Sequence, residues 1–171
     1  MQKKNKHTEE KEQIIILNEI IKNLETTKNN KETFENKIKL YGTINYSRKQ
    51  LFPRISSHIT KNKEYEDTFL NYITAESMIL DIFMVIESDI IQQLETTNTK
   101  IEEKIIKLIN FSLEILIILE KILENKYKYL EKNKTKTEYE KDNTEYTNEL
   151  YHIQNKFYTL IYDEKIDFRV Q

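Results

Sequence analysis

The residues best suited to chemistry in this chain are its three histidines and the carboxylates near them. Glu149 and His152 have the i, i+3 spacing by which one helix can present a carboxylate and an imidazole to a metal ion. Carboxylate-bridged di-iron bundles need a second such pair, and neither His7 nor His58 has a Glu three residues before it. We therefore interpret Glu149 and His152 as surface or seam residues, and we expect no metal and no cofactor.

Arg54 and His58 form the other pair with catalytic potential, because an Arg and a His can together handle the 2′-hydroxyl and the phosphate of RNA. All-α nucleases of the HEPN type use such a pair with a wider interval, so the match fails on spacing. Pro53 also leaves the helical frame of the pair open. The chain has no Cys and one Gly, which excludes thiol nucleophiles and Gly-rich phosphate loops. We expect a protein that is not an enzyme.

Charge is divided sharply between two neighbouring segments. Residues 36–63 contain seven basic and no acidic residues, and residues 64–99 contain eight acidic and no basic residues. Cations interleaved with aromatic rings are what single-stranded nucleic acid binding requires. The residues predicted to contact a nucleic acid or an acidic partner are Lys37, Lys39, Tyr46, Arg48, Lys49, Phe52, Arg54, Lys61 and Lys63. The favoured alternative is that the basic segment neutralises its acidic neighbour within the chain.

Three carboxylates lie within or beside the apolar stripe that follows the basic segment. They are Glu76, Asp81 and Glu87. An unpaired carboxylate in such a stripe would mark a functional site. We expect instead that they face water or meet Lys and Arg side chains of the basic segment.

The elements that position these residues are helices, because the apolar residues recur at intervals of three and four. The first helix is predicted to end at Tyr41, with Gly42 as a left-handed cap. The second follows Pro53 and Asn62. The third and fourth are predicted to begin with the capping boxes Thr99–Glu102 and Thr137–Glu140.

Short links between the later helices favour antiparallel neighbours. The predicted fold is therefore an all-α, antiparallel up-and-down bundle of about four long helices, with an irregular basic connector around residues 42–62. One domain spans residues 1–171. Within it, residues 1–10 are expected to be a disordered leader, and residues 163–171 a tail that adds as a short strand or lies across the bundle. Continuity of the first helix through residues 25–32 stays open.

Composition places the chain among soluble proteins. It contains 26 Ile, 24 Lys and 16 Asn, a bias typical of an AT-rich genome, and 33% of its residues are charged. No signal peptide and no run of about 20 apolar residues is visible, so we expect a cytoplasmic protein without a transmembrane segment.

The function favoured by these observations is that of a non-catalytic helical interaction protein, which acts through protein–protein contacts and self-association. The broad apolar stripes of the second and third helices motivate this prediction. The predicted interface residues are Ile82, Met84, Val85, Ile117 and Ile118. The alternative is a nucleic-acid-binding accessory protein that uses residues 37–63.

Overall fold

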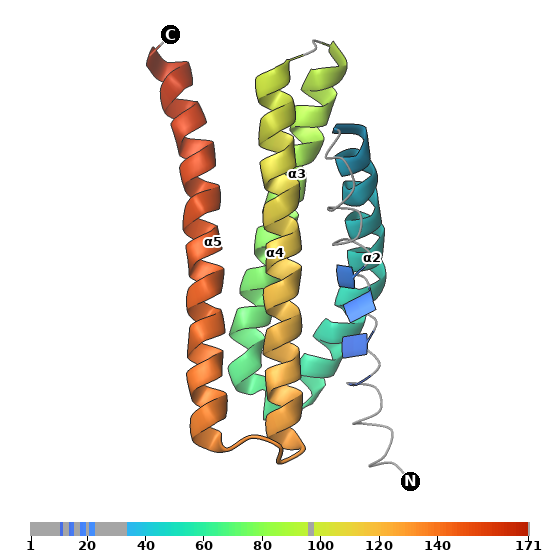
Figure 1. Ribbon diagram of the computed structural model, residues 1–171, viewed down its shortest axis with the longest axis vertical. Helices are drawn as coiled ribbons and strands as arrows, with labels where there is room; N and C mark the ends of the chain where they lie inside the picture. The colour runs from blue at the N-terminus through green and yellow to red at the C-terminus, as the bar shows by residue number, and fades with distance from the viewer. Residues whose placement is uncertain are drawn as a thin grey trace.

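The computed structural model of the protein is an antiparallel bundle of long helices (Figure 1). The structure describes residues 11, 14–15, 18–19, 21–22, 34–95 and 98–170, with only the backbone of residues 94–95 and 163–170. The helices are α2 (Phe34–Lys61), α3 (Glu66–Glu95), α4 (Thr99–Leu130) and α5 (Lys136–Val170), and a short 3-10 helix, Lys63–Tyr65, precedes α3. The described part of the chain contains no strand. The prediction of an all-α bundle is confirmed.

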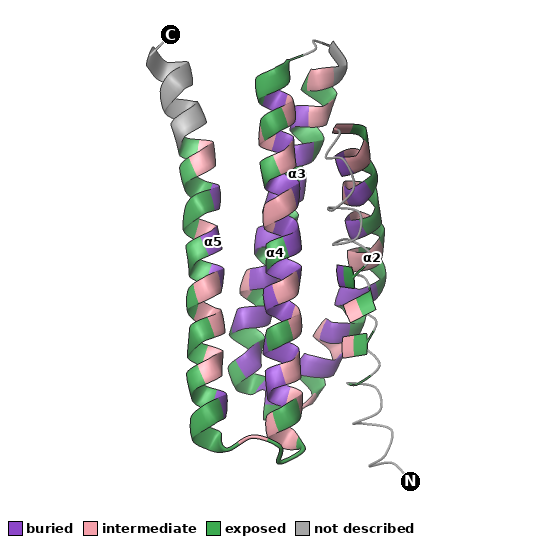
Figure 2. Ribbon diagram, in the orientation of Figure 1, coloured by how far each residue is buried: buried purple, intermediate pink, exposed green. Residues whose placement is uncertain are grey.

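The core lies where α3 and α4 pack against each other, and both of these helices also contact α2 and α5. The buried residues, purple in Figure 2, lie mainly along the helix faces that meet in the middle of the bundle. β-branched Ile slightly lowers helix propensity, but burial of an Ile side chain stabilises the fold by about 1.5–3 kcal/mol, which outweighs that cost. Many of the largest fully buried side chains are accordingly isoleucines: Ile44, Ile55, Ile79, Ile82, Ile86 and Ile105.

Helix α2 runs without interruption through Gly42 and Pro53 to Lys61. The predicted end at Tyr41 is therefore wrong, and so is the irregular connector around residues 42–62. A glycine costs a helix about 1 kcal/mol, and an interior proline about 3 kcal/mol. The apolar face of α2 continues beyond both residues, and its side chains at 44, 51, 55 and 59 are all buried. Tertiary burial thus maintains a helix that local propensity would end.

The left-handed helix cap expected at Gly42 is found instead at the end of α4. Lys132 has a φ of 62° and is the only described residue with a positive φ. Its N–H donates to the carbonyl of Tyr129, and the N–H of Asn133 donates to the carbonyl of Lys128. These two hydrogen bonds form a Schellman motif, in which glycine is the usual residue at the left-handed position. A lysine with a Cβ occupies it here.

The capping motifs of α4 and α5 lie slightly earlier in the sequence than predicted. Asn98 rather than Thr99 is the N-cap of α4, and its side-chain oxygen accepts a backbone N–H of the first turn at 2.9 Å. The capping box of α5 pairs Thr135 with Glu138, and each side chain accepts the other's backbone N–H. It therefore begins two residues before Thr137. Side-chain capping at the start of both helices was predicted correctly, but the residues that form the caps lie one and two positions earlier than predicted.

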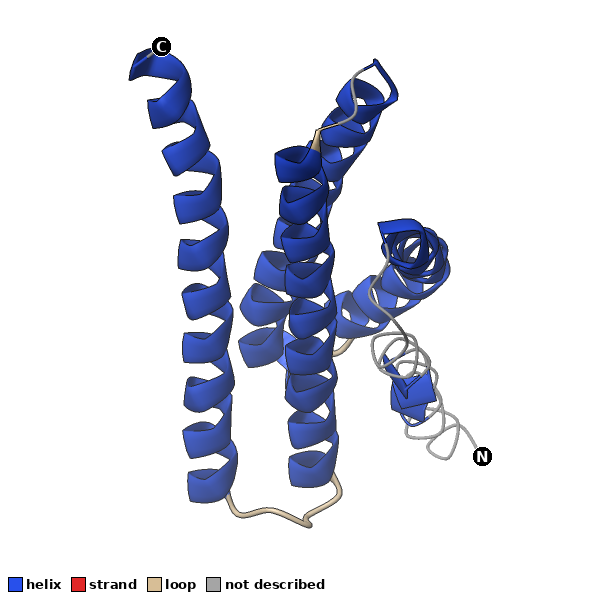
Figure 3. Ribbon diagram, turned by 45° about the horizontal axis from the view of Figure 1, so that its top comes forward, coloured by secondary structure: helices blue, strands red, loops and turns tan. Residues whose placement is uncertain are grey.

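The described residues near both ends of the chain are helical. Helix α5 continues to Val170, so residues 163–170 are helical rather than a strand. The described residues near the start are also helical and pack on α4, where the Asn18 amide donates to Glu120 at 2.9 Å. Residues 1–10 and 25–32 lie outside the described residues. Viewed from a second direction, α2 is inclined to the other three helices (Figure 3).

Candidate functional site

Helix α2 presents a basic outer face. Because the helix is continuous, exposed residues three, four, seven or eight positions apart lie close together around it, and the set below covers a little less than half of the helix circumference. We call this set the basic α2 face, and it consists of Lys39, Tyr46, Lys49, Arg54 and Lys61. The predicted contact residue Lys63 is exposed in the short helix that follows. The continuous helix thus exposes Lys49, Arg54 and Lys61, three of the cations that the sequence places in a connector.

Three other predicted contact residues lie on the side of α2 that packs against the bundle, where they are buried or half-buried. Lys37 is buried, and its ammonium donates to the Asn110 side chain of α4 at 2.9 Å. Phe52 is buried, and its carbonyl accepts the Tyr72 hydroxyl at 3.0 Å. Arg48 is half-buried, with its guanidinium 5.1 Å from the centre of the Phe83 ring. These side chains stabilise the packing of α2 in the bundle.

Two lysines of α4 form ion pairs with acidic residues of α3. Lys104 pairs with the buried Asp89 at 3.0 Å, and Lys126 pairs with Asp67 at 2.8 Å. The basic α2 segment meets the acidic helix in another way, since the Tyr41 hydroxyl donates to Glu87 at 2.9 Å. Burial and this hydrogen bond raise the pKa of Tyr41 to about 12, so its hydroxyl stays protonated and able to donate.

Lys126 is the centre of a polar cluster where α3, α4 and α5 meet. Its ammonium lies 4.9, 5.6 and 6.0 Å from the ring centres of Tyr139, Tyr129 and Tyr65. Asp67 accepts hydrogen bonds from this ammonium and from the Tyr139 hydroxyl. Burial alone would raise the pKa of Asp67, but the two hydrogen bonds and the lysine charge together lower it. The cluster joins three helices, and each of its charges has a partner.

Helix α3 has a second apolar face that the bundle leaves exposed. The core side of the helix carries Tyr72, Ile79, Ile82 and Ile86, all buried. On the opposite side, large apolar side chains recur in a 3-4 heptad spacing, interrupted by Ser77 and Glu87. We call this set the outer α3 stripe, and it consists of Leu70, Ile73, Leu80, Met84 and Ile91. Six of the eleven large apolar side chains found exposed, the neighbouring Phe69 included, belong to α3.

The predicted interface residues divide between the core and the surface. Ile82 and Ile118 are buried within the chain, and Val85 and Ile117 are half-buried. Met84 is 69% exposed and belongs to the outer α3 stripe. The other four members of the stripe were not predicted as interface residues. The 3-4 spacing of positions 70, 73, 80, 84 and 91 was the sequence signal that could have identified them.

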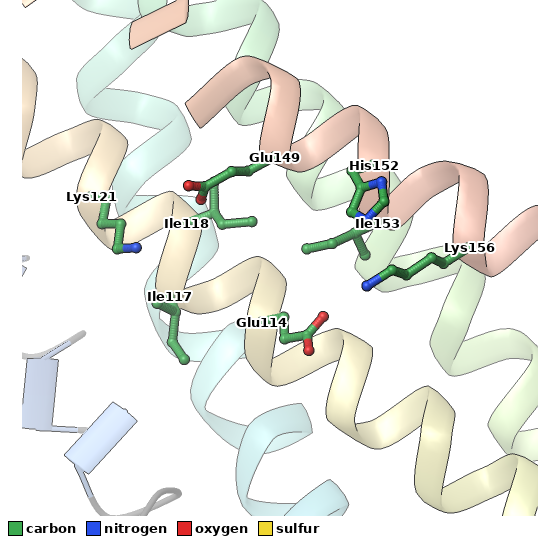
Figure 4. A pocket seen from close by; sticks show the side chains of 8 residues that line it. All are labelled: Glu114, Ile117, Ile118, Lys121, Glu149, His152, Ile153 and Lys156. Carbon is green, nitrogen blue, oxygen red and sulfur yellow. The ribbon is translucent and has the colours of Figure 1, made fainter. Parts of the chain in front are cut away.

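A shallow pocket of about 270 Å³ lies between the middles of α4 and α5. Its floor is apolar, and its rim carries two carboxylates, two lysines and His152 (Figure 4). The charged ends of Glu114 and Lys156 point toward one another across the opening. Glu149 and His152 both line it, but nowhere in the described residues do three or more His, Asp or Glu side chains gather as metal ligands would.

The other candidate catalytic residues from the sequence that the structure describes do not line that pocket. His58 is buried, with its ring edge-to-face on Tyr65 at 5.1 Å and its Nδ1 3.4 Å from the Asn62 amide. Arg54 lies on the exposed side of α2. Glu76 is half-buried, whereas Asp81 is exposed. His7 falls outside the described residues.

By length and composition, one described segment could cross a membrane. It is Lys63–Gln93, which contains most of α3 and has a mean hydropathy of 1.5 in its most apolar window. Nearly half of that window, 44%, is buried inside the bundle, and core helices of soluble proteins meet the same criterion. The result follows from the two apolar faces of α3.

Comparison of the chain with protein-family models, with curated proteins and with solved structures found no match.

Proposed function

We propose that this protein is a non-catalytic helical interaction protein that acts through protein–protein contact at the outer α3 stripe. The observation that carries the proposal is the exposure of a regularly spaced apolar stripe on a helix whose opposite face already forms the core. Isolated apolar residues on a surface are common, whereas apolar residues in register along one helix are typical of an interaction site.

The spacing of the stripe supports a helical contact in particular. Leu70 and Ile91 are 21 positions apart, so the stripe is about 32 Å long at 1.5 Å per residue. Two apolar positions per heptad form the narrow seam by which helices pair in coiled coils. Members of the stripe such as Met84 and Leu70 are 69% and 65% exposed, so both can be buried by a partner without rearrangement of the core.

A photo-crosslinking amino acid at position 84 tests this proposal. We expect adducts of discrete mass from position 84 in cells of the native source, and none from position 151. Tyr151 is a suitable control because it is an exposed aromatic side chain on a different helix, α5. Absence of adducts from position 84, together with a monomeric mass for the purified chain at all concentrations, would refute the proposal.

A second candidate function is nucleic acid binding by the basic α2 face. The observation in its favour is the alignment of four cations and the exposed Tyr46 along one side of a continuous helix. Fluorescence anisotropy with single-stranded DNA and RNA at increasing salt tests it. Replacement of Lys39, Lys49 and Arg54 by Gln should flatten the salt dependence by about 0.7 log units per log unit of salt for each phosphate that is no longer neutralised. No binding at low salt would exclude this function.

A further inference from the structure

The outer α3 stripe lies on a helix whose charged residues are all acidic. Exposed acidic residues lie one turn before the stripe at Glu66, beside it at Asp81 and within it at Glu87, and residues 64–99 contain no Lys or Arg. The two lysines of α4 that pair with acids of α3 do so at Asp67 and Asp89, not at these three exposed residues. The exposed charged residues along the stripe are therefore all acidic, and one of them, Glu87, also accepts the Tyr41 hydroxyl of α2.

We propose that the outer α3 stripe docks one amphipathic helix of another protein, with apolar residues in 3-4 spacing and Lys or Arg on its flanks. This inference rests on the proposed function and deepens it by naming the partner's chemistry. The apolar seam accepts a helix because knobs at a and d positions fit between side chains of the same spacing. Basic flanks are favoured because complementary charges set partner choice, while like charges disfavour the wrong partner.

A second copy of this chain fits the stripe less well in either arrangement. The stripe from Leu70 to Ile91 has its midpoint between Leu80 and Asp81, so antiparallel pairing of two α3 helices centred there places Asp81 opposite Leu80 of the copy, with the two Asp81 carboxylates only one residue apart along the helix axis. The basic α2 face of a copy has the right charge. Its one large apolar side chain is Tyr46, so it offers no seam to fill the stripe.

Two synthetic helical peptides of three heptads test the proposal with the full chain. Both carry Leu at a and d; one has Lys at e and g, and the other has Glu. We expect the Lys peptide to bind about tenfold more tightly than the Glu peptide at low salt, with a smaller ratio as salt screens the charges. Binding is followed by anisotropy of labelled peptide, at concentrations where the peptide alone is monomeric.

Variants of the chain separate the apolar and the charged contributions. The double variant Leu70→Gln, Met84→Gln should weaken binding of the Lys peptide at least about tenfold, because two large apolar side chains no longer pack against the peptide. The double variant Asp81→Asn, Glu87→Gln should bring the two peptides to similar affinity. The control variant Tyr46→Gln, an exposed aromatic on α2, should bind the Lys peptide as the wild type does.

Three other outcomes would contradict the charge selection, the identity of the partner or the proposed function. Equal binding of the two peptides by the wild type overturns the charge selection and leaves helix docking intact. A dimer that Met84→Gln dissociates makes a second copy the occupant, which overturns this inference but agrees with the proposed function. Binding to phosphatidylcholine vesicles with no binding to either peptide overturns both, because α3 would then contact lipid.

Discussion

Asp67→Asn should lower the free energy of unfolding at pH 7 by weakening the polar cluster around Lys126. That lysine is 5% exposed, and Asp67 is its charged partner at 2.8 Å. Removal of one partner from a fully buried ion pair costs about 3–5 kcal/mol. The cost is smaller here because the Asp67 side chain is 47% exposed and an Asn oxygen can still accept hydrogen bonds. We therefore expect a loss of about 1–2 kcal/mol.

The same substitution should change how stability depends on pH. The hydrogen bonds from Lys126 and Tyr139 hold the pKa of Asp67 below its ordinary value of 3.8, against the opposing effect of burial. A carboxylate with a lowered pKa in the folded state stabilises the fold fully above about pH 5, and this contribution is lost as the pH falls through the folded-state pKa. The variant has no carboxylate at position 67. The unfolding free energies of the two proteins should therefore converge in acid.

Urea titrations followed by circular dichroism at pH 7, 5, 4 and 3 measure this convergence. Glu66→Gln is the matched control, because it removes an exposed carboxylate next to Asp67 and should change stability little at any pH. A difference between wild type and Asp67→Asn that is the same at pH 7 and pH 3 would refute the electrostatic reasoning. So would a double-mutant cycle with Lys126→Met that gives no coupling energy.

The backbone and core of the bundle provide further tests, each measured by urea unfolding. Gly42→Ala should stabilise the protein by about 0.5–1 kcal/mol, because nothing lies within 4 Å of the added Cβ and the position is inside a helix. Lys132→Gly should also stabilise it, by about 1 kcal/mol, because it relieves a left-handed φ; a loss would contradict the Schellman assignment. Thr135→Ala should cost about 1 kcal/mol, whereas Thr137→Ala should be nearly neutral, and the reverse order would contradict the capping box observed here. Ile82→Ala should cost about 2–5 kcal/mol, because this side chain is fully buried, and a loss below 1 kcal/mol would place it outside the core.

The parts of the fold that could be predicted from sequence are those that depend on periodicity. Intervals of three and four along residues 66–95 and 99–130 identify α3 and α4, because a helix must place such residues on one side to bury them. The links after these helices are short in both the prediction and the structure. Antiparallel order follows from those lengths.

Prediction failed where a local signal competed with burial. Gly42 and Pro53 both disfavour helix, so the sequence pointed to a connector between them. The structure keeps the helix because the buried Ile44 and Ile55 hold it against the bundle. The one left-handed cap in the described residues falls on Lys132, where the chain must turn between α4 and α5 whether or not a glycine is present.

The candidate interaction site could be predicted only in part, because both sides of α3 are apolar. Ile82 and Met84 have similar side chains and lie two positions apart, yet one is fully buried and the other is 69% exposed. The periodicity of the apolar residues identifies both stripes, but it does not indicate which of the two is buried. Which stripe becomes core depends on the directions from which α2, α4 and α5 approach.

The sequence by itself therefore determined that the protein is helical, roughly where its later helices begin and end, and that its charge is divided between neighbouring segments. Only the tertiary structure decided that α2 is continuous, that Lys126 is buried among tyrosines, and which stripe of α3 stays exposed. The physical reason is that helix period and charge are properties of residues close together in the chain. Burial depends on contacts between residues such as Asp67 and Tyr139, 72 positions apart, which no local pattern specifies.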